Sequence, residues 1–265
     1  MIPPTAEALL EELGISSPSE IDIDAVAQYC GATILYEPLS GCEARILGHK
    51  DRAYITVNAS APRARQRFSA GHELGHWLRD RGRVAFACTD SQFMSGWDSV
   101  DPERRANRFA ADLLLPTFLF RPAARLKPVT FDTVRALADA FTTSLTATAI
   151  RLVEEGGLPS MLICSDETGR RMWFARSPIV HRALWPRDQP GSWTAARRLL
   201  NSGLAGDPED VDADEWIEHP NSSRYVLREH SIRIGERVLT LLWWKDESQI
   251  TDLADRDDDD DDRER

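Results

Sequence analysis

The chain has 265 residues, 42% of them hydrophobic, which is enough for one large domain or two modest ones with a buried core. Its formal net charge at pH 7 is −11, of which the C-terminal residues 255–265 carry −5, leaving −6 for the rest of the chain. Tight binding to duplex DNA depends on basic residues that neutralise phosphates. The composition therefore argues against a protein that holds DNA by charge alone.

The beginning of the chain and its cysteines indicate a cellular compartment. The first residues, Met1-Ile2-Pro3-Pro4, lack the basic flank and apolar run of a signal peptide, and no segment reaches the roughly 18 apolar residues of a membrane helix. Four cysteines lie far apart, so neither a thiolate metal site nor a disulfide framework is expected: Cys30, Cys42, Cys88 and Cys164. We expect a cytoplasmic protein without a membrane span.

Hydrophobic spacing and turn residues predict a mixed N-terminal part. Two short helices ending at glycines are expected over 5–14 and 24–31, and two strands over 32–37 and 53–57. A longer helix is predicted over 63–81 and a loop over 83–100. Another helix follows, which opens at Pro102, a favoured first position, and ends at Leu115.

The C-terminal part has a different character. Two helices are predicted over 130–155, and a domain boundary near 156–159. Segments 161–164 and 172–175 flank a turn sequence and predict a hairpin, and further strands are expected over 224–232 and 237–244. The acidic tail cannot bury apolar surface, so we expect it to be disordered.

The sequence His72-Glu73-Leu74-Gly75-His76 lies within the predicted helix over 63–81. Residues four apart share one face of a helix, so His72 and His76 can reach the same ion. Catalytic zinc commonly takes three protein ligands and one water. Glu73 follows His72 directly, so its carboxylate can accept a proton from that water. The pattern predicts a zinc-dependent hydrolase.

The third ligand must come from another segment, and six residues have suitable chemistry: His49, Cys88, Asp90, Asp98, Asp101 and Glu103. Glu103 is in the first turn of the next helix, but a carboxylate is favoured there in any protein, so spacing alone leaves its role open. Asn107, one turn further along that face, is expected to orient a ligand imidazole. Gly75 costs a helix about 1 kcal/mol, which suggests that another element packs closely there.

Two segments of the chain resemble the motifs of the ImmA/IrrE metallopeptidases. Residues 67–78 read Arg-Phe-Ser-Ala-Gly-His-Glu-Leu-Gly-His-Trp-Leu and look like the active-site helix of that family. Residues 103–116 resemble its second motif, a glutamate followed by Ala-Asn-Arg-Phe-Ala-Ala and an apolar run closed by proline. The resemblance is strong over roughly residues 20–120. It implies that Glu103 is the third zinc ligand.

The resemblance also implies an architecture and an activity. The α+β fold would consist of a zincin-like peptidase domain over 1–128, a helix-turn-helix-like helical pair over 129–158, a GAF-like sensor domain with antiparallel strands over 159–250, and a tail over 251–265. The implied activity is that of an endopeptidase using Zn²⁺, or Mn²⁺ in cells. Its implied substrate is a helix-turn-helix repressor, whose cleavage would derepress stress-response or mobile-element genes.

Two other functions stay open: a DNA-binding regulator with a structural zinc site, and a scaffold that binds a repressor without cutting it. A DNA-binding helix-turn-helix usually has a glycine four residues after a small alanine, whereas here Ala138 is followed by Thr142. Arg151 is the only basic residue before Glu154 in the second predicted helix. A reading helix offers several groups to base edges. The sequence therefore argues against direct DNA binding by this segment.

Overall fold

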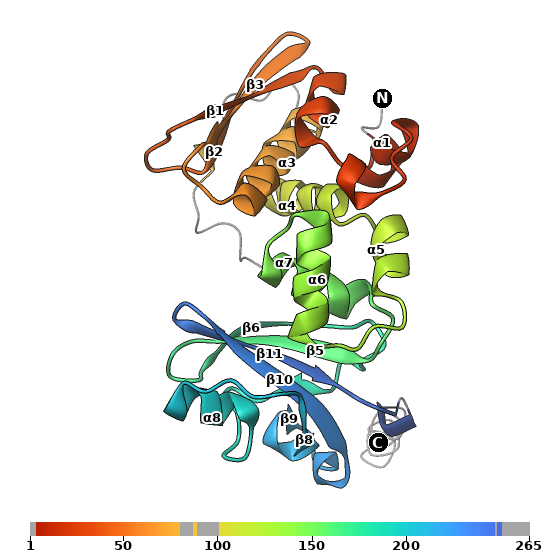
Figure 1. Cartoon of the computed structure of the whole chain (residues 1–265), viewed down its shortest axis with the longest axis vertical. Coiled ribbons are helices and arrows are strands. Elements are labelled where there is room, and N and C mark those ends of the chain that lie inside the picture. Colours follow the sequence, from red (N-terminus) through yellow and green to blue (C-terminus); the bar gives the residue numbers. More distant parts are fainter. Residues whose placement is uncertain (1–3, 80–86, 89–100, 247, 251–265) are drawn as a thin grey trace, which may run out of the picture. The chain divides into compact units, whose positions relative to one another are not determined.

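The computed structural model describes residues 4–79, 87–88, 101–246 and 248–250, and it confirms the predicted α+β class (Figure 1). The chain divides into two compact units, residues 1–123 with 137–148 and residues 124–136 with 149–265. The divisions fall inside helices α6 (Phe131–Phe141) and α7 (Leu145–Glu155) and before the last residue of α5 (Thr117–Ala124), so each of these helices contributes to both units. The predicted acidic tail and most of the predicted loop over 83–100 lie outside the described residues.

The first unit contains a four-stranded mixed sheet of order β1-β3-β2-β4. Its strands are β1 (Ala32–Glu37), β2 (Ala44–His49), β3 (Arg52–Asn58) and β4 (Ala87–Cys88). Strand β1 pairs with β3 in parallel, and β2 pairs antiparallel with both β3 and β4. The prediction missed β2, because its two large apolar residues, Ile46 and Leu47, are adjacent and point to opposite faces.

Helices cover one face of this sheet. The helices of the first unit, besides its parts of α6 and α7, are α1 (Ala6–Glu12), α2 (Ile23–Tyr29), α3 (Arg63–Arg79), α4 (Pro102–Leu114) and α5 (Thr117–Ala124). Helix α3 packs against β1, β2 and β3, and α4 packs against α3 (Figure 1). The prediction missed α5 because it contains Pro122, a residue that usually interrupts a helix.

The second unit is built on a five-stranded antiparallel sheet of order β6-β5-β11-β10-β8. Its strands are β5 (Ser160–Ser165), β6 (Arg171–Arg176), β8 (Glu209–Asp212), β10 (Val226–Ile234) and β11 (Arg237–Trp243). Strands β5 and β6 form the predicted hairpin. A two-stranded sheet joins β7 (Trp185–Pro186) to β9 (Ile217–Glu218), and helix α8 (Ala195–Ser202) packs on β10 and β11. Trp216 and Trp244 are buried in this unit's core.

Two further expectations concern membrane-spanning helices and the cysteines. None of the helices in the described part of the chain combines the length and the apolar character needed to cross a bilayer. The cysteines with described side chains are free thiols: Cys30, Cys42 and Cys164.

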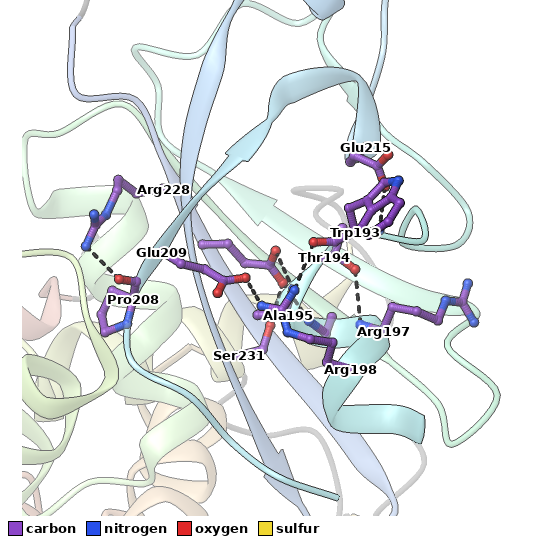
Figure 2. A network of polar contacts seen from close by, with 12 residues as sticks. Trp193, Thr194, Ala195, Arg197, Arg198, Pro208, Glu209, Glu215, Arg228 and Ser231 are labelled. Carbon is purple, nitrogen blue, oxygen red and sulfur yellow. Dashed lines mark hydrogen bonds and ion pairs between the residues drawn. The ribbon is translucent and has the colours of Figure 1, made fainter. Parts of the chain in front are cut away.

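Helix α8 begins on a buried carboxylate. Glu229 of β10 is 0% exposed and accepts hydrogen bonds from the backbone N–H groups of Ala195 and Ala196, at 3.0 and 2.7 Å. The Ser231 hydroxyl donates to the same carboxylate at 2.9 Å, and Thr194 caps the helix through its own side chain (Figure 2). The first N–H groups of a helix have no partner within it, so Glu229 supplies one and holds α8 on the sheet.

We predict that Glu229→Ala destabilises the protein by about 3 kcal/mol, because it leaves the amide N–H groups of Ala195 and Ala196 without their acceptor. Urea unfolding followed by tryptophan fluorescence measures the change. The matched control is Glu236→Ala in the exposed turn between β10 and β11, which should change stability by less than about 0.5 kcal/mol. Equal stability of the two variants would contradict the assigned role of Glu229.

Candidate metal centre

Helix α3 carries the two predicted histidine ligands into the interior of the first unit. His72, Glu73 and His76 are all buried, with 2%, 0% and 3% of their surfaces exposed. The side chain of Arg79 at the end of the helix is exposed. Because His72 and His76 are four residues apart, their rings lie on one face of α3, with centroids 4.7 Å apart.

Glu103 of α4 completes a compact group with these histidines. The Nε2 atoms of His72 and His76 are 3.1 Å apart. Carboxylate oxygens of Glu103 lie 3.2 Å from Nε2 of His72 and 3.3 Å from Nε2 of His76. Donors about 2.0–2.1 Å from a tetrahedral zinc ion are about 3.3 Å from each other. The two imidazoles and one carboxylate therefore fit a zinc ion in both spacing and chemistry.

The other third-ligand candidates have different positions. His49 is exposed at the end of β2, and Asp101 is the N-cap of α4, where its carboxylate accepts a hydrogen bond from the Glu103 amide at 3.0 Å. Asp90 and Asp98 lie outside the described residues, and the structure does not describe the side chain of Cys88. Within the described residues, His72, His76 and Glu103 are the group of three that could hold a metal ion.

Asn107 of α4 contacts one of the two histidines. Its Oδ1 atom is 2.9 Å from Nδ1 of His72. An amide oxygen can only accept, so this contact assigns the proton of the neutral ring to Nδ1 and leaves the lone pair on Nε2, the atom that faces His76 and Glu103. A partner of this kind fixes both the tautomer and the orientation of a ligand imidazole.

Small residues allow α3 and α4 to approach closely enough to form this group. A Cβ atom added to Gly75 would lie 3.1 Å from Cα of Ala106 and 3.2 Å from Cβ of Phe109. The same addition to Gly71 would lie 3.4 Å from Cα of Ala110. The close packing predicted at Gly75 is thus confirmed. Gly71 was not predicted to pack closely, although its spacing of four from Gly75 places both glycines on one helix face.

A buried arginine anchors the first half of α3. Arg67 is 6% exposed, and its guanidinium donates to the backbone carbonyls of Ile21 at 2.9 Å and Phe141 at 2.8 Å. Burial lowers the pKa of this guanidinium, which still remains charged because arginine deprotonates only at very high pH. Thr142, which follows Phe141 in the chain, has a φ of 53°, which is unusual for a β-branched residue. Arg67 therefore fixes α3 against the end of α6.

The chain is similar to known proteins in both sequence and fold. Residues 27–153 match the family model Peptidase_M78, described as the IrrE N-terminal-like domain. The chain is similar in fold to a Mycobacterium tuberculosis transcriptional regulator, with a TM-score of 0.57 and 15% sequence identity over 90% of this chain and 74% of that chain. No curated protein sequence matches the chain.

We predict that His72→Ala, His76→Ala and Glu103→Ala each lose bound zinc, because each removes one donor of the group. Asn107→Ala should keep the ligands but weaken zinc binding about 10–100-fold, because the His72 ring loses its orienting acceptor. Elemental analysis and titration against a competing chelator measure these effects. Full zinc content in Glu103→Ala would exclude Glu103 as the ligand and make Asp101 the next candidate.

A second prediction concerns the glycines of α3. Alanine favours a helix over glycine by about 1 kcal/mol, so Gly71→Ala, whose new methyl group makes ordinary contacts, should be neutral or stabilising. Gly75→Ala pushes against the backbone of α4 and should displace Glu103, weakening zinc binding about tenfold or more. Thermal unfolding and zinc titration compare the two variants. Equal zinc affinity in both would show that the site tolerates movement of α4.

Proposed function

Because residues 27–153 match the family model of the IrrE N-terminal-like domain, we propose that this chain is a zinc-dependent endopeptidase that cleaves a helix-turn-helix transcriptional repressor. The match confirms the resemblance predicted from the two sequence motifs. The observation that carries the proposed activity is the convergence of His72, His76 and Glu103 on one point, with Glu73 beside them on α3. This donor set is one that hydrolytic zinc sites use.

Glu73 is the residue proposed to move protons. When bound, a zinc ion would lower the pKa of a coordinated water toward neutrality and would polarise the scissile carbonyl. Glu73 accepts the proton of the attacking water and returns it to the amine that leaves. Its carboxylate is fully buried, so bulk water does not surround this proton carrier. The contact with Asn107 holds the His72 imidazole in place while Glu73 transfers the proton.

The similarity to the IrrE N-terminal-like family also suggests the roles of the two units, the substrate and the metal. The first unit would act as a zincin-like peptidase and the second as a GAF-like sensor that controls it, in the cytoplasm. The substrate would be a repressor whose loss activates stress-response or mobile-element genes. Zn²⁺, or Mn²⁺ in cells, would be the metal.

The DNA-binding alternative finds little support in α7. Arg151, the basic residue that precedes Glu154 in this helix, is 2% exposed, and its guanidinium lies 3.8 Å from the Glu155 carboxylate. A buried side chain cannot contact bases without leaving its site. A structural zinc site would also be closed by a fourth protein ligand, whereas the group found among the described residues has three.

The Glu73→Gln variant distinguishes a peptidase from a scaffold that binds a repressor without cutting it. It keeps the size of the side chain and all three ligands but removes the basic oxygen. We predict that zinc content stays near that of the parent, while cleavage falls by about 10²–10⁴-fold, the usual contribution of a positioned proton carrier. The measurement is incubation with helix-turn-helix repressors encoded nearby, with added Zn²⁺ or Mn²⁺, followed by mass spectrometry of the products.

The matched control is Glu11→Gln on the exposed side of α1, which should cleave like the parent. Undiminished cleavage by Glu73→Gln would exclude Glu73 as the base. Loss of zinc would instead make it a ligand or a residue that holds the fold. Binding of the repressor without any cleavage by the parent would favour the scaffold.

A further inference from the structure

The sheet of the first unit has a second face, turned away from α3. Successive side chains of a strand point to opposite faces of a sheet, and burial alternates accordingly over Ala44–Leu47 of β2 and Arg52–Ile55 of β3. Ile55 points into the core, and Thr56 on the outward side is buried between Leu35 and Arg45. We define the outer face by six of the outward side chains: Leu35, Glu37, Arg45, Leu47, Arg52 and Tyr54. All six are exposed. Helices α2 and α3 lie on the opposite side of the sheet (Figure 1).

The apolar residues of the outer face form one patch. Leu47 and Tyr54 stand directly opposite each other on β2 and β3, and Leu35 is paired with Thr56, two residues from Tyr54. Directly opposed side chains lie about 5 Å apart and diagonal ones about 7–8 Å, within reach of each other. The exposed fractions are 62% for Leu47, 48% for Tyr54 and 39% for Leu35. Contiguous exposed apolar residues mark interaction surfaces more often than scattered ones.

The patch and its surroundings carry a small excess of positive charge. Arg45 and Arg52 flank the patch, and Glu37 is the acidic residue among the six that define the outer face. The turn between β2 and β3 adds one charge of each sign, Lys50 and Asp51. Basic residues therefore exceed acidic ones by one here, whereas the whole chain has a net charge of −11. Because both arginines lie beside the apolar residues, the carboxylates of an acidic partner would meet opposite charges next to this patch.

We propose that the outer face is a docking surface for an acidic amphipathic segment of the protein substrate, an inference that rests on the proposed peptidase function. Apolar side chains of the segment cover Leu35, Leu47 and Tyr54, and its carboxylates pair with Arg45 and Arg52. The surface lies on the side of the sheet opposite the helix that carries His72 and His76. It therefore contributes to recognition of the whole substrate and not to the chemistry at the cut bond.

The first test is independent of cleavage and uses the full chain with two fluorescent synthetic peptides. One alternates leucine and glutamate, and the other alternates leucine and lysine. Fluorescence anisotropy should show binding of the acidic peptide about tenfold or more tighter than that of the basic one, weakened by added salt. Tyr54→Ser and Arg45→Glu should each reduce binding of the acidic peptide about tenfold. The matched control is Tyr29→Ser on α2, where the tyrosine is 54% exposed.

The second test uses the repressor that the parent cleaves, and a short peptide that spans its cut. Tyr54→Ser and Arg45→Glu should raise KM for the whole repressor about tenfold without changing kcat, and should leave turnover of the short peptide unchanged. Failure of the parent to cut either substrate would remove the proposed function, while the anisotropy measurement would still decide whether the outer face binds acidic segments.

Four outcomes would overturn the proposal. The two synthetic peptides could bind equally well, or Tyr29→Ser could weaken binding as much as Tyr54→Ser. A melting temperature lowered by more than about 5 °C in Tyr54→Ser would mean that the chain itself covers this face. A dimer of the parent seen by sedimentation and lost in Tyr54→Ser would assign the surface to a second copy.

Discussion

The close approach of α3 and α4 is the constraint on which the metal centre depends. Ligands on two helices converge only if the helix backbones come nearer than large side chains would permit, and Gly71 and Gly75 on α3 face Ala110 and Ala106 on α4. The same packing places Asn107 against His72 and brings Glu103 to both histidines. The low helix propensity of the two glycines is offset by the close packing that they permit between α3 and α4.

The sequence predicted the local parts of the site better than its long-range ones. His72, Glu73 and His76 follow from helical spacing alone, whereas Glu103 was one of several third-ligand candidates until the family motif favoured it. Elsewhere, elements were missed where tertiary contacts override local signals. Helix α8 is only eight residues long and takes its first acceptor from Glu229, a residue 33 positions away from Ala196. A hydrogen bond to so distant a residue cannot be predicted from a short window of sequence.

The two helices predicted over 130–155 are present as α6 and α7, and two arginines bind the chain around the turn that joins them. The turn between them adopts a left-handed conformation at Thr142, so threonine occupies the backbone geometry that usually selects glycine. Arg67 of α3 donates to the carbonyl just before this turn, and Arg151 is buried. Arg67 and Arg151 therefore bind to groups of the chain itself.

The way the metal donors are supported has a consequence for how the protein can be handled. His72, His76 and Glu103 belong to helices already held by an apolar core that includes Leu74, Phe109 and Leu113, and not to short loops that only an ion could close. Small zinc domains unfold when a chelator removes their ion, because coordination supplies their folding energy. Here the scaffold is self-supporting. Stripping the ion with a chelator should yield an empty, folded protein that different divalent ions can refill, so that metal preference can be compared on a single preparation.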